Sequence, residues 1–426
     1  MHYPEELLHF LWKFRLFSQQ RLFLVSGEPV EIISPGIHNK HAGPDFEEAK
    51  IRISETVWAG NVEMHLRSSD WNQHGHTSDK AYNNVILHVV LHHDAPVFRN
   101  DGTEIPVLVL NGLIPGNIEA NYRDLMENLS WIPCEKKIAA IDEFHIQSWL
   151  SRVLVERLEE KSQMLEKLLK EYKGSWDNAF YVMLARNFGF KTNGLPFELL
   201  ARSLPQTILA KHKNNLMQLE ALIFGQAGFL EADLDDEYHK RLKSEYLFLK
   251  KKYQLTPLEA FLWKFLRLRP SNFPTIRLAQ FAVLIAKSNH LFSKIIEIED
   301  VKVLKTCFAA IHASSYWDTH YRFGKEGRAR SGMGAESVDN ILLNTVVLFI
   351  FYYGKCSGKQ NFVSRAIALL ESLAPENNNI TRGFKKIGVA GSDAAASQAM
   401  LQLKKSYCDT RKCLNCGIGT KLLNQN

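Results

Sequence analysis

The hydrophobic and polar positions of the first 110 residues predict a helix followed by a small sheet. Residues 4–17 place apolar side chains at helical spacing, with acids in the first turn. Behind them, short segments alternate apolar and polar positions or are almost continuously apolar, as strands are. The strands are expected at 21–25 or 29–33, 49–53, 57–66 and 84–93, and a turn signal at 100–102 predicts a hairpin over 98–110.

From residue 117 onward the apolar positions follow a helical period, and Pro and Gly interrupt the pattern. No fixed repeat length is present, so a solenoid is not predicted. The predicted helices are 142–172, 176–187, 196–204, 215–224, 237–253, 257–268, 274–288, 337–352, 361–373 and 394–407. The fold class is therefore α+β or α/β: a small mixed sheet with flanking helices, followed by a large all-α region. The expected domains are 1–115, 116–405 and a cysteine-containing tail, 406–426.

Composition narrows the class of protein. With 426 residues, 23% charged and 11% aromatic, the chain is long enough for several cores and too apolar to be disordered. Its longest apolar run, 341–353, is too short for a membrane span and is interpreted as a buried helix. The N-terminal residues lack a signal-peptide pattern, and six cysteines do not form a secreted disulfide framework. We therefore expect a cytoplasmic protein without membrane contact.

The segment 41–93 contains the strongest candidate for a catalytic site. Gly43 and Pro44 force a turn that directs the Asp45 carboxylate away from the strand ladder. Because side chains alternate along a strand, Glu63 and His65 share one face, and Asp45 can approach that face from the adjacent strand. Two carboxylates and a nitrogen at such a position typically bind Mg²⁺ or Mn²⁺ together with a water molecule. We expect the Asp45 and Glu63 carboxylates to lie within about 6 Å of each other.

This order of helix, strand, Pro-Asp corner, strand, Glu-x-His strand, helix and strand resembles the core of the PD-(D/E)XK nuclease superfamily, which has a restriction-endonuclease-like fold. The resemblance covers roughly the first 95 residues and is carried by Pro44-Asp45 and Glu63-Met64-His65. It implies that Asp45 and Glu63 bind the metal. The superfamily has Lys where this chain has His65, so His65 takes the role of that Lys or the site is altered. The whole chain also resembles a bacterial family known only as a domain of unknown function.

Other polar residues near this segment are candidates for supporting roles. In some members of the superfamily an acid of the first helix reaches the metal, and Glu5 or Glu6 would occupy that place here; acids in a first turn also suit the helix dipole. The candidates in the segment itself are His41, Asp70, His74 and His76. The alternative is that Asp45 is only a turn residue and Glu63-x-His65 only a strand face.

Charge is distributed unevenly along the chain. Residues 1–115 hold 9 Lys and Arg against 14 Asp and Glu, a balance of −5. Because the whole chain has a net charge of +6, residues 116–426 have a net charge of +11. An acidic segment with 10 of the 16 His, followed by a basic body, suits a metal centre with DNA or RNA as partner. Moderate positive charge is also ordinary in helical proteins. Two basic loops could bind phosphate or could simply be exposed; their candidate residues are Arg269, Arg277, Lys325, Arg328 and Arg330.

The C-terminal tail contains a second candidate metal site. Cys408, Cys413 and Cys416 lie within nine residues, and the Cys-x2-Cys-Gly sequence is typical of a metal-binding turn. Cys134 is our first choice as a distant fourth ligand, with Cys307 and Cys356 as alternatives. The spacing predicts a structural metal site, either Zn²⁺ or an iron–sulfur cluster; some nucleases of the superfamily have a [4Fe–4S] cluster with a similar outline. Reduced thiols without metal are the alternative.

Three hypotheses about function follow. The first is a metal-dependent phosphodiesterase acting on nucleic acid, in which Asp45 and Glu63 hold the metal and His65 orients the water. The second is an inactive nucleic-acid-binding or scaffold protein with a nuclease-like first domain. The third is a Zn²⁺ hydrolase of another kind, which would use His74 and His76 with Asp79 or His41.

Overall fold

The computed structural model describes residues 4–288, 290–327 and 331–425. The chain divides into two compact units. Unit 1 comprises the described residues up to Trp149 together with those from Leu403 onward, and unit 2 comprises Leu150–Gln402. The cysteine-containing tail thus belongs to the same unit as the sheet, whereas the sequence placed boundaries near residues 115 and 405. The boundary at residue 150 lies within helix α4, Glu143–Glu171.

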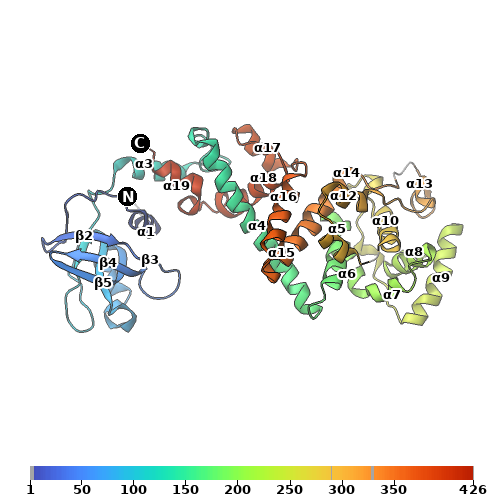
Figure 1. Cartoon of the computed structure of the whole chain (residues 1–426), viewed down its shortest axis with the longest axis horizontal. Helices are drawn as coiled ribbons and strands as arrows, with labels where there is room; N and C mark the ends of the chain where they lie inside the picture. The colour runs from blue at the N-terminus through green and yellow to red at the C-terminus, as the bar shows by residue number, and fades with distance from the viewer. Residues whose placement is uncertain (1–3, 289, 328–330, 426) are drawn as a thin grey trace. The chain divides into compact units, whose positions relative to one another are not determined.

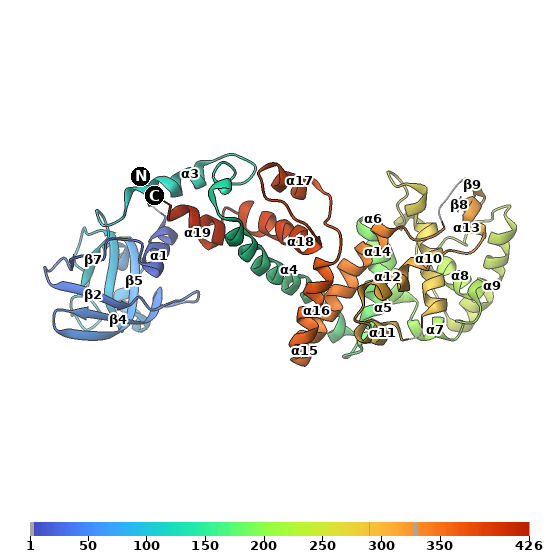
Figure 2. The ribbon, with the colours of Figure 1, turned by 45° about the horizontal axis from the view of Figure 1, so that its top comes forward.

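Unit 1 is built around a mixed seven-stranded sheet with the order β1-β2-β4-β5-β6-β7, in which β3 pairs with β4. Strands β2, β4 and β5 form an antiparallel meander, while β6 and β7 run parallel to β5. Helix α1 packs against β5 beside the sheet (Figures 1 and 2). The elements are α1 Glu5–Phe14, β1 Leu22–Phe23, β2 Pro29–Ser34, β3 Ile37–His38, β4 Phe46–Ile53, β5 Thr56–Arg67, β6 Val85–His92 and β7 Val107–Val109. The predicted mixed sheet followed by a helical region is confirmed.

Strand β5 is paired along both edges, and α1 and α2 (Asp70–Gln73) pack against it, so its residues 62–65 are buried. It pairs with β4 on one side and with β6 on the other, where Glu63 is opposite His88. Gly60 allows the close approach of β6, because a Cβ atom there would lie 2.5 Å from Ile86 Cγ2 and 2.7 Å from the Asn84 carbonyl oxygen. The sheet therefore fixes Glu63 in its interior.

The connection from β5 to β6 is irregular and carries two of the candidate histidines. It consists of short helical turns: α2 Asp70–Gln73, η1 His76–Ser78 and η2 Lys80–Tyr82. Asp94 anchors its start, accepting hydrogen bonds from the hydroxyls of Ser68 and Ser69 at 3.0 and 2.8 Å. Trp71 is fully buried, and its indole N–H donates to Thr77 Oγ1 at 3.1 Å. The connection is thereby held against the sheet.

The hairpin expected at 98–110 is only partly formed. The Gly102 N–H donates to the Arg99 carbonyl, so the predicted turn is present. The two arms, however, share a single bridge between Phe98 and Glu104, and the second arm becomes β7, which runs parallel to β6. Pairing with the buried strand β6 hides more apolar surface than pairing within the hairpin would.

The rest of unit 1 is helical. Helix α3 was not expected from the sequence, and α19 in the tail packs against it. The elements are α3 Gly116–Glu127, η3 Ile138–Ala140, the π-helical turn η7 Lys404–Cys408, η8 Cys413–Asn415 and α19 Gly417–Leu423.

Unit 2 consists of helices with one small hairpin. The predicted helices are confirmed except at 257–268, where the described backbone contains one short turn. That backbone bonds to its neighbours instead, since the Leu258 N–H donates to the Gln226 carbonyl and Asn193 bonds both the N–H and C=O of Lys264. The helices are α5 Trp176–Phe188, α6 Phe190–Ser203, α7 Gln206–Ala210, α8 Leu216–Gln226, α9 Glu237–Tyr253, α10 Pro274–Lys287, α11 Leu291–Glu297, α12 Val301–Ala309, α13 Tyr316–Thr319, α14 Ala335–Ile341, α15 Val347–Ser357, α16 Gln360–Glu371, α17 Asn379–Lys386 and α18 Ala394–Leu403. Shorter elements are η4 Ala260–Leu262, η5 Pro270–Asn272, the π-helical η6 Leu342–Val346, and strands β8 His320–Arg322 and β9 Lys325–Glu326.

One continuous helical stretch in the described part of the chain, Ala335–Ser357, is long and apolar enough to cross a membrane by length and composition alone. Of its most apolar window, 61% is buried inside the structure. A core helix has these same properties.

Candidate metal centre

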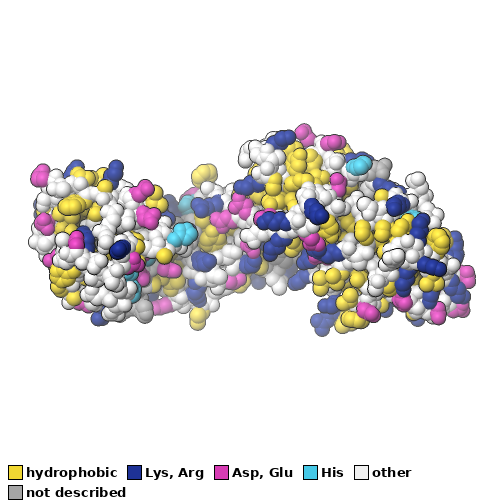
Figure 3. All heavy atoms as spheres, turned by 90° about the horizontal axis from the view of Figure 1, so that it is seen from below, with side chains coloured by type: hydrophobic (Ala, Val, Ile, Leu, Met, Phe, Trp, Pro, Cys, Tyr) yellow, Lys and Arg dark blue, Asp and Glu magenta, His cyan; other side chains and the backbone are white. Residues whose placement is uncertain are grey.

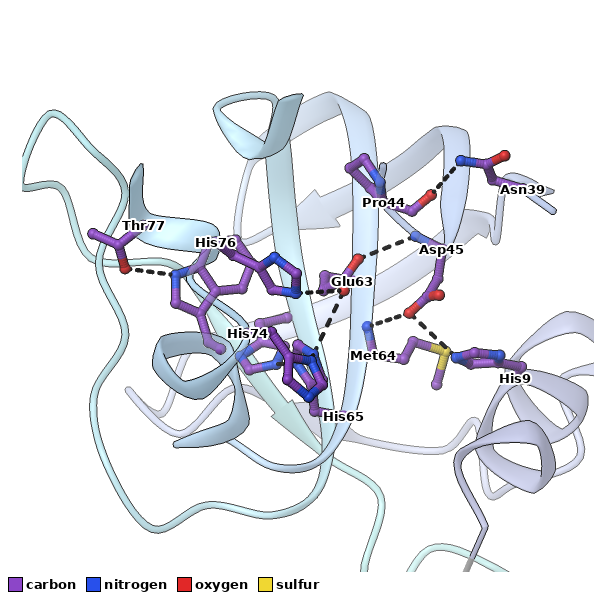
Figure 4. Close-up of polar contacts among 12 residues, drawn as sticks. His9, Asn39, Pro44, Asp45, Glu63, Met64, His65, His74, His76 and Thr77 are labelled. Carbon is purple, nitrogen blue, oxygen red and sulfur yellow. Dashed lines mark hydrogen bonds and ion pairs between the residues drawn. The ribbon is translucent and has the colours of Figure 1, made fainter. Parts of the chain in front are cut away.

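Glu63 lies at the centre of a cluster of histidines on one face of β5 (Figure 4). It is 4% exposed, and His65 on the same face is 1% exposed. Glu63 Oε1 lies 3.6 Å from His65 Nε2. The period-two geometry of the strand therefore produces the predicted shared face.

Two further imidazoles reach this face from the connection between β5 and β6. His74 ends α2 and His76 begins η1, and the left-handed backbone of Gly75 between them (φ 75°) turns both rings toward the sheet. His74 Nδ1 lies 3.0 Å from His65 Nε2, and His76 Nε2 lies 3.2 Å from Glu63 Oε1. One ligand atom from each of the three histidines lies within 4.8 Å of the other two. Three imidazoles and a carboxylate thus converge.

A fourth histidine supports His65 from behind. His88 in β6 is fully buried, and its Nε2 is hydrogen-bonded to His65 Nδ1 at 2.8 Å. This contact fixes the orientation of the His65 ring and leaves His65 Nε2 on the side of Glu63 and His74. Such an outer partner is the usual means of orienting a histidine ligand.

Burial shifts the pKa values of the cluster toward the uncharged forms of its groups. Burial, followed by the charge of Asp45, raises the pKa of Glu63 to about 9. Burial and the neighbouring histidines lower the pKa of His65 to about 2 and that of His88 to about 3, and burial also lowers the pKa of His76. The lowered pKa values of His65, His76 and His88 favour their neutral forms, and a metal-binding imidazole must be neutral.

The donor atoms fit a dication. No Lys or Arg of the described residues forms an ion pair with Glu63. Its Oε1 faces His65 and His76, and its Oε2 accepts the Asp45 N–H. The buried His76 Nε2 makes no hydrogen bond of normal geometry within the described structure, although it is directed toward Glu63 Oε1. A metal ion between these atoms would satisfy both groups. Nitrogen-rich sets of this kind suit Zn²⁺ and similar transition metals better than Mg²⁺.

Asp45 meets Glu63 on the side away from the three histidines (Figure 4). Its backbone N–H donates to Glu63 Oε2 at 3.1 Å, and its Oδ2 accepts the Met64 N–H at 3.0 Å. The structure thus brings Asp45 and Glu63 together at the predicted corner. His9 from α1 completes this side, with its Nε2 3.2 Å from Asp45 Oδ2.

Asp45 shifts the pKa values of two residues of α1, Glu5 and His9. Burial lowers the pKa of His9, but the hydrogen bond and charge of Asp45 outweigh it, and the net shift is upward. The pKa of Glu5 is raised by burial and then by Asp45. Glu6 is exposed. Of the two predicted helix acids, Glu5 is therefore the one near the site.

The remaining predicted supporting residues have structural contacts. Asp70 Oδ2 accepts the Arg67 N–H at 2.9 Å, and Asp79 accepts the Ala81 N–H at the start of η2. His41 is exposed, and its backbone N–H bonds Asn39 Oδ1. The structure therefore groups His74 and His76 with Glu63 and His65, rather than with Asp79 or His41.

The residues expected to bind nucleic acid differ in their exposure. Arg269 and Lys325 are exposed. Arg277 is 3% exposed and donates to Gln280, Asn272 and Ser337, so the expectation that it binds phosphate is wrong. Arg328 and Arg330 lie outside the described residues. Figure 3 shows Lys and Arg interspersed with Asp and Glu over the visible face of the helical unit.

Sequence reasoning missed His9 and assigned no role to His88. His9 lies one helical turn after Glu5, a spacing that places both on one face of α1. His88 is the register partner of Glu63 in β6. The parallel register of β5 and β6 places His88 beside Glu63, but the pattern of apolar positions in the sequence does not determine that register.

Comparison with known proteins gives a single match. A family model described as "Protein of unknown function (DUF2851)" matches residues 5–379. No curated protein and no solved structure matches the chain.

Proposed function

The chain belongs to the DUF2851 family of proteins of unknown function, and from the geometry of its metal centre we propose that it is a metal-dependent phosphodiesterase acting on nucleic acid. The ligands of this centre would be Glu63, His65, His74 and His76. One observation carries the proposal: the imidazoles of His65, His74 and His76 converge beside the buried Glu63 carboxyl group, which no Lys or Arg of the described residues pairs with.

The donor set favours Zn²⁺ over the Mg²⁺ or Mn²⁺ expected from the sequence. Bound there, a metal ion that accepts a fifth ligand would act as a Lewis acid, polarising a phosphoryl oxygen and lowering the pKa of water. Three imidazoles and one carboxylate would hold it, and all four come from β5 and the connection that follows it.

Asp45 and His9, on the other side of Glu63, would contact the substrate and transfer a proton to it. The Asp45 and His9 side chains are 22% and 16% exposed, so both can meet a ligand from solvent. Because Asp45 raises the pKa of His9, a protonated His9 can donate to the leaving oxygen of a phosphodiester. Asp45 would hold the His9 ring in position for that transfer.

Nucleic acid is the proposed substrate for two reasons. The order of α1, β2, the Asp45 corner, β4, β5 with Glu63, α2 and β6 follows that of the nuclease core that the sequence resembles. The residues after 115 also carry a net +11, which attracts a polyanion. The alternative is a scaffold that binds nucleic acid without cleaving it. We place the protein in the cytoplasm, with Ala335–Ser357 as a core helix rather than a membrane anchor.

The test measures metal content and hydrolysis on the same preparations. The full chain, reconstituted with Zn²⁺, Mn²⁺ or Mg²⁺ in turn, is assayed with bis-p-nitrophenyl phosphate and with labelled DNA and RNA. We expect hydrolysis to fall at least about 100-fold in Glu63→Gln and His76→Ala, since a ligand matters at least as much as its outer partners. His41→Ala, an exposed histidine of the same segment, is the matched control and should keep full activity.

Each result decides between the alternatives. Hydrolysis that survives in both ligand variants would remove the centre from the reaction. Metal bound through Glu63 and His76, with nucleic acid bound but not cleaved, would support the scaffold instead.

A further inference from the structure

The cysteines of unit 1 do not provide a second metal centre. Thiolates that share one Zn²⁺ ion lie about 4 Å apart, because each is about 2.3 Å from the ion in a tetrahedral arrangement. Among the described residues, no three of the sulfur atoms of Cys134, Cys408, Cys413 and Cys416 lie within 4.8 Å of one another. The four thiols therefore do not fit one Zn²⁺ ion.

Unit 2 contains a cationic side chain, Arg322 in β8, that no acid neutralises in the described part of the chain. Its guanidinium lies on the ring of Phe265, with Cζ 3.6 Å from the ring centroid, and 5.4 Å from the centroid of Phe273. Its Nε is buried and has no hydrogen-bond partner within the described structure. Stacking on aromatic rings holds an arginine in place but leaves its charge free for an anion.

The segment 261–273, which does not form the helix expected at 257–268, presents Phe265 to this arginine. Trp263 anchors the segment: it is buried, and its indole N–H donates to the Ala227 carbonyl at 2.8 Å. The chain then turns, since the Leu268 N–H donates to the Phe265 carbonyl at 3.3 Å. Arg267 in this turn has a left-handed backbone (φ 63°), a conformation that is often found at functional sites.

Strand β8 is held beside the end of this segment. At the start of α10, Thr275 Oγ1 donates to the Tyr321 carbonyl at 2.5 Å, and β8 packs against α10 (Figure 2). The ring centroid of Phe273 lies 5.2 Å from that of Phe265 and 5.8 Å from that of Tyr321. The segment and the strand therefore form one continuous surface around Arg322.

This surface is basic. No Asp or Glu occurs between residues 259 and 297 of the sequence. The one acid of β9, Glu326, lies 4.0 Å from His320 Nε2. The segment carries three exposed cations, and none of them forms an ion pair with a described residue: Lys264, Arg267 and Arg269. Together with Arg322 they form a positive surface that suits a polyanion.

Large apolar side chains are exposed among these cations. Phe261 is 79% exposed and Leu266 is 83% exposed. Exposed aromatic rings interleaved with cations are typical of proteins that bind single-stranded nucleic acid, because unpaired bases stack on the rings while phosphates meet the cations. A duplex keeps its bases stacked inside and would use only the cations. The apolar residues therefore favour a single strand over a duplex.

We propose that the surface formed by Phe261, Lys264, Arg267, Arg269 and Arg322 binds single-stranded nucleic acid. The arginines contact phosphates, and Phe261 stacks on a base. This inference rests on nucleic acid being the partner, as the proposed function does, but it does not depend on the metal centre of unit 1.

The test titrates labelled oligo(dT), oligo(U) and a DNA duplex of matched length with the full chain in chelator, and records fluorescence anisotropy. We expect both single strands to bind more tightly than the duplex. The double variant Arg267→Gln, Arg269→Gln should weaken single-strand binding at least about 10-fold and reduce the slope of log Kd against log salt by about 1.4, which is about 0.7 for each phosphate contact. The matched control removes the same charge at two exposed lysines of α17, Lys385→Gln and Lys386→Gln, and should bind as the wild-type chain does.

Phe261→Ala separates stacking from charge. Because this change removes no charge, it should weaken single-strand binding at least about 5-fold and leave the salt slope unchanged. Glu63→Gln should bind both oligonucleotides as the wild-type chain does, so this surface and the metal centre can fail independently. Circular dichroism checks that each variant is folded, and all substituted positions in unit 2 are exposed.

Two results would contradict the proposal. Absence of binding to any oligonucleotide, or an equal loss in the control at Lys385 and Lys386, would overturn the surface. Duplex binding as tight as single-strand binding, with no effect of Phe261→Ala, would overturn the assignment to single strands.

Discussion

Glu63 is the residue on which the proposed centre depends. A carboxylate that is 4% exposed costs several kcal/mol to ionise unless a cation is nearby, and its described neighbours are neutral imidazoles. The fold maintains this unfavourable arrangement through the Asp45 N–H and the pairing of β5 on both sides. A fold that carries such a cost generally does so for function.

We expect Glu63→Gln to have opposite effects on stability without metal and with it. In chelator near pH 7 the variant should unfold at the same or a higher urea concentration than the wild-type chain. Burial raises the pKa of Glu63 to about 9, so folding must protonate this carboxyl group, and the amide avoids that cost. With Zn²⁺ at about 100 times its Kd, the wild-type chain should gain about 2.7 kcal/mol more than the variant does. Urea titrations with and without chelator measure this difference. Equal Zn²⁺ stabilisation of both chains would contradict the role of Glu63 as a ligand.

His88 should act on the metal through His65. Replacing it with Gln removes the ring that orients His65 Nδ1 and is expected to lower metal affinity by about 10–100-fold. His92→Gln, four residues along the same strand and exposed, is the control and should bind metal as the wild-type chain does. Calorimetric titration of Zn²⁺ provides the comparison. Unchanged affinity in the His88 variant would mean that His65 is positioned by packing alone.

At the scale of elements, the centre combines one regular strand with one irregular connection. Alternation along β5 was enough to predict that Glu63 and His65 share a face, and the Asp45 corner was recognised from Gly43 and Pro44. The rings of His74 and His76 are placed by Gly75 and by the anchoring of the connection at Asp94, and neither contact leaves a periodic signal. His9 depends on how α1 rotates against β5, which is decided by packing.

In unit 2, the helix predicted at 257–268 is a second case in which tertiary contacts without a periodic sequence signal decide the structure. Its apolar residues suit a helix, but the side chain of Asn193 and the carbonyl of Gln226 take the hydrogen bonds that a helix would use. Tertiary bonds of this kind override local propensity.

Gly60 sets the distance between β5 and β6. Gly60→Ala should lower the free energy of unfolding by about 1–3 kcal/mol, because the new methyl group would overlap Ile86 and the Asn84 carbonyl. Gly116→Ala, at the start of α3 where the space is open, is the matched control. Urea unfolding monitored by circular dichroism compares the two variants. A Gly60 variant as stable as the control would show that the strands can separate without cost.

At the scale of the whole molecule, the proposed metal centre lies in unit 1. Metal removal should therefore lower the melting temperature of the transition that belongs to unit 1 and leave that of unit 2 unchanged. Scanning calorimetry of the full chain with and without chelator tests this, and the helical stretch Leu150–Gln402 serves as the internal reference. A shift confined to unit 2 would place the metal elsewhere.

The most direct test of the metal centre is anomalous X-ray diffraction from crystals of the Zn²⁺-loaded chain, recorded above and below the zinc absorption edge. We predict a peak at about 2.0–2.2 Å from Glu63 Oε1 and from one ring nitrogen each of His65, His74 and His76. A crystal that contains Zn²⁺ at other positions, with no anomalous peak among these four side chains, would contradict the account.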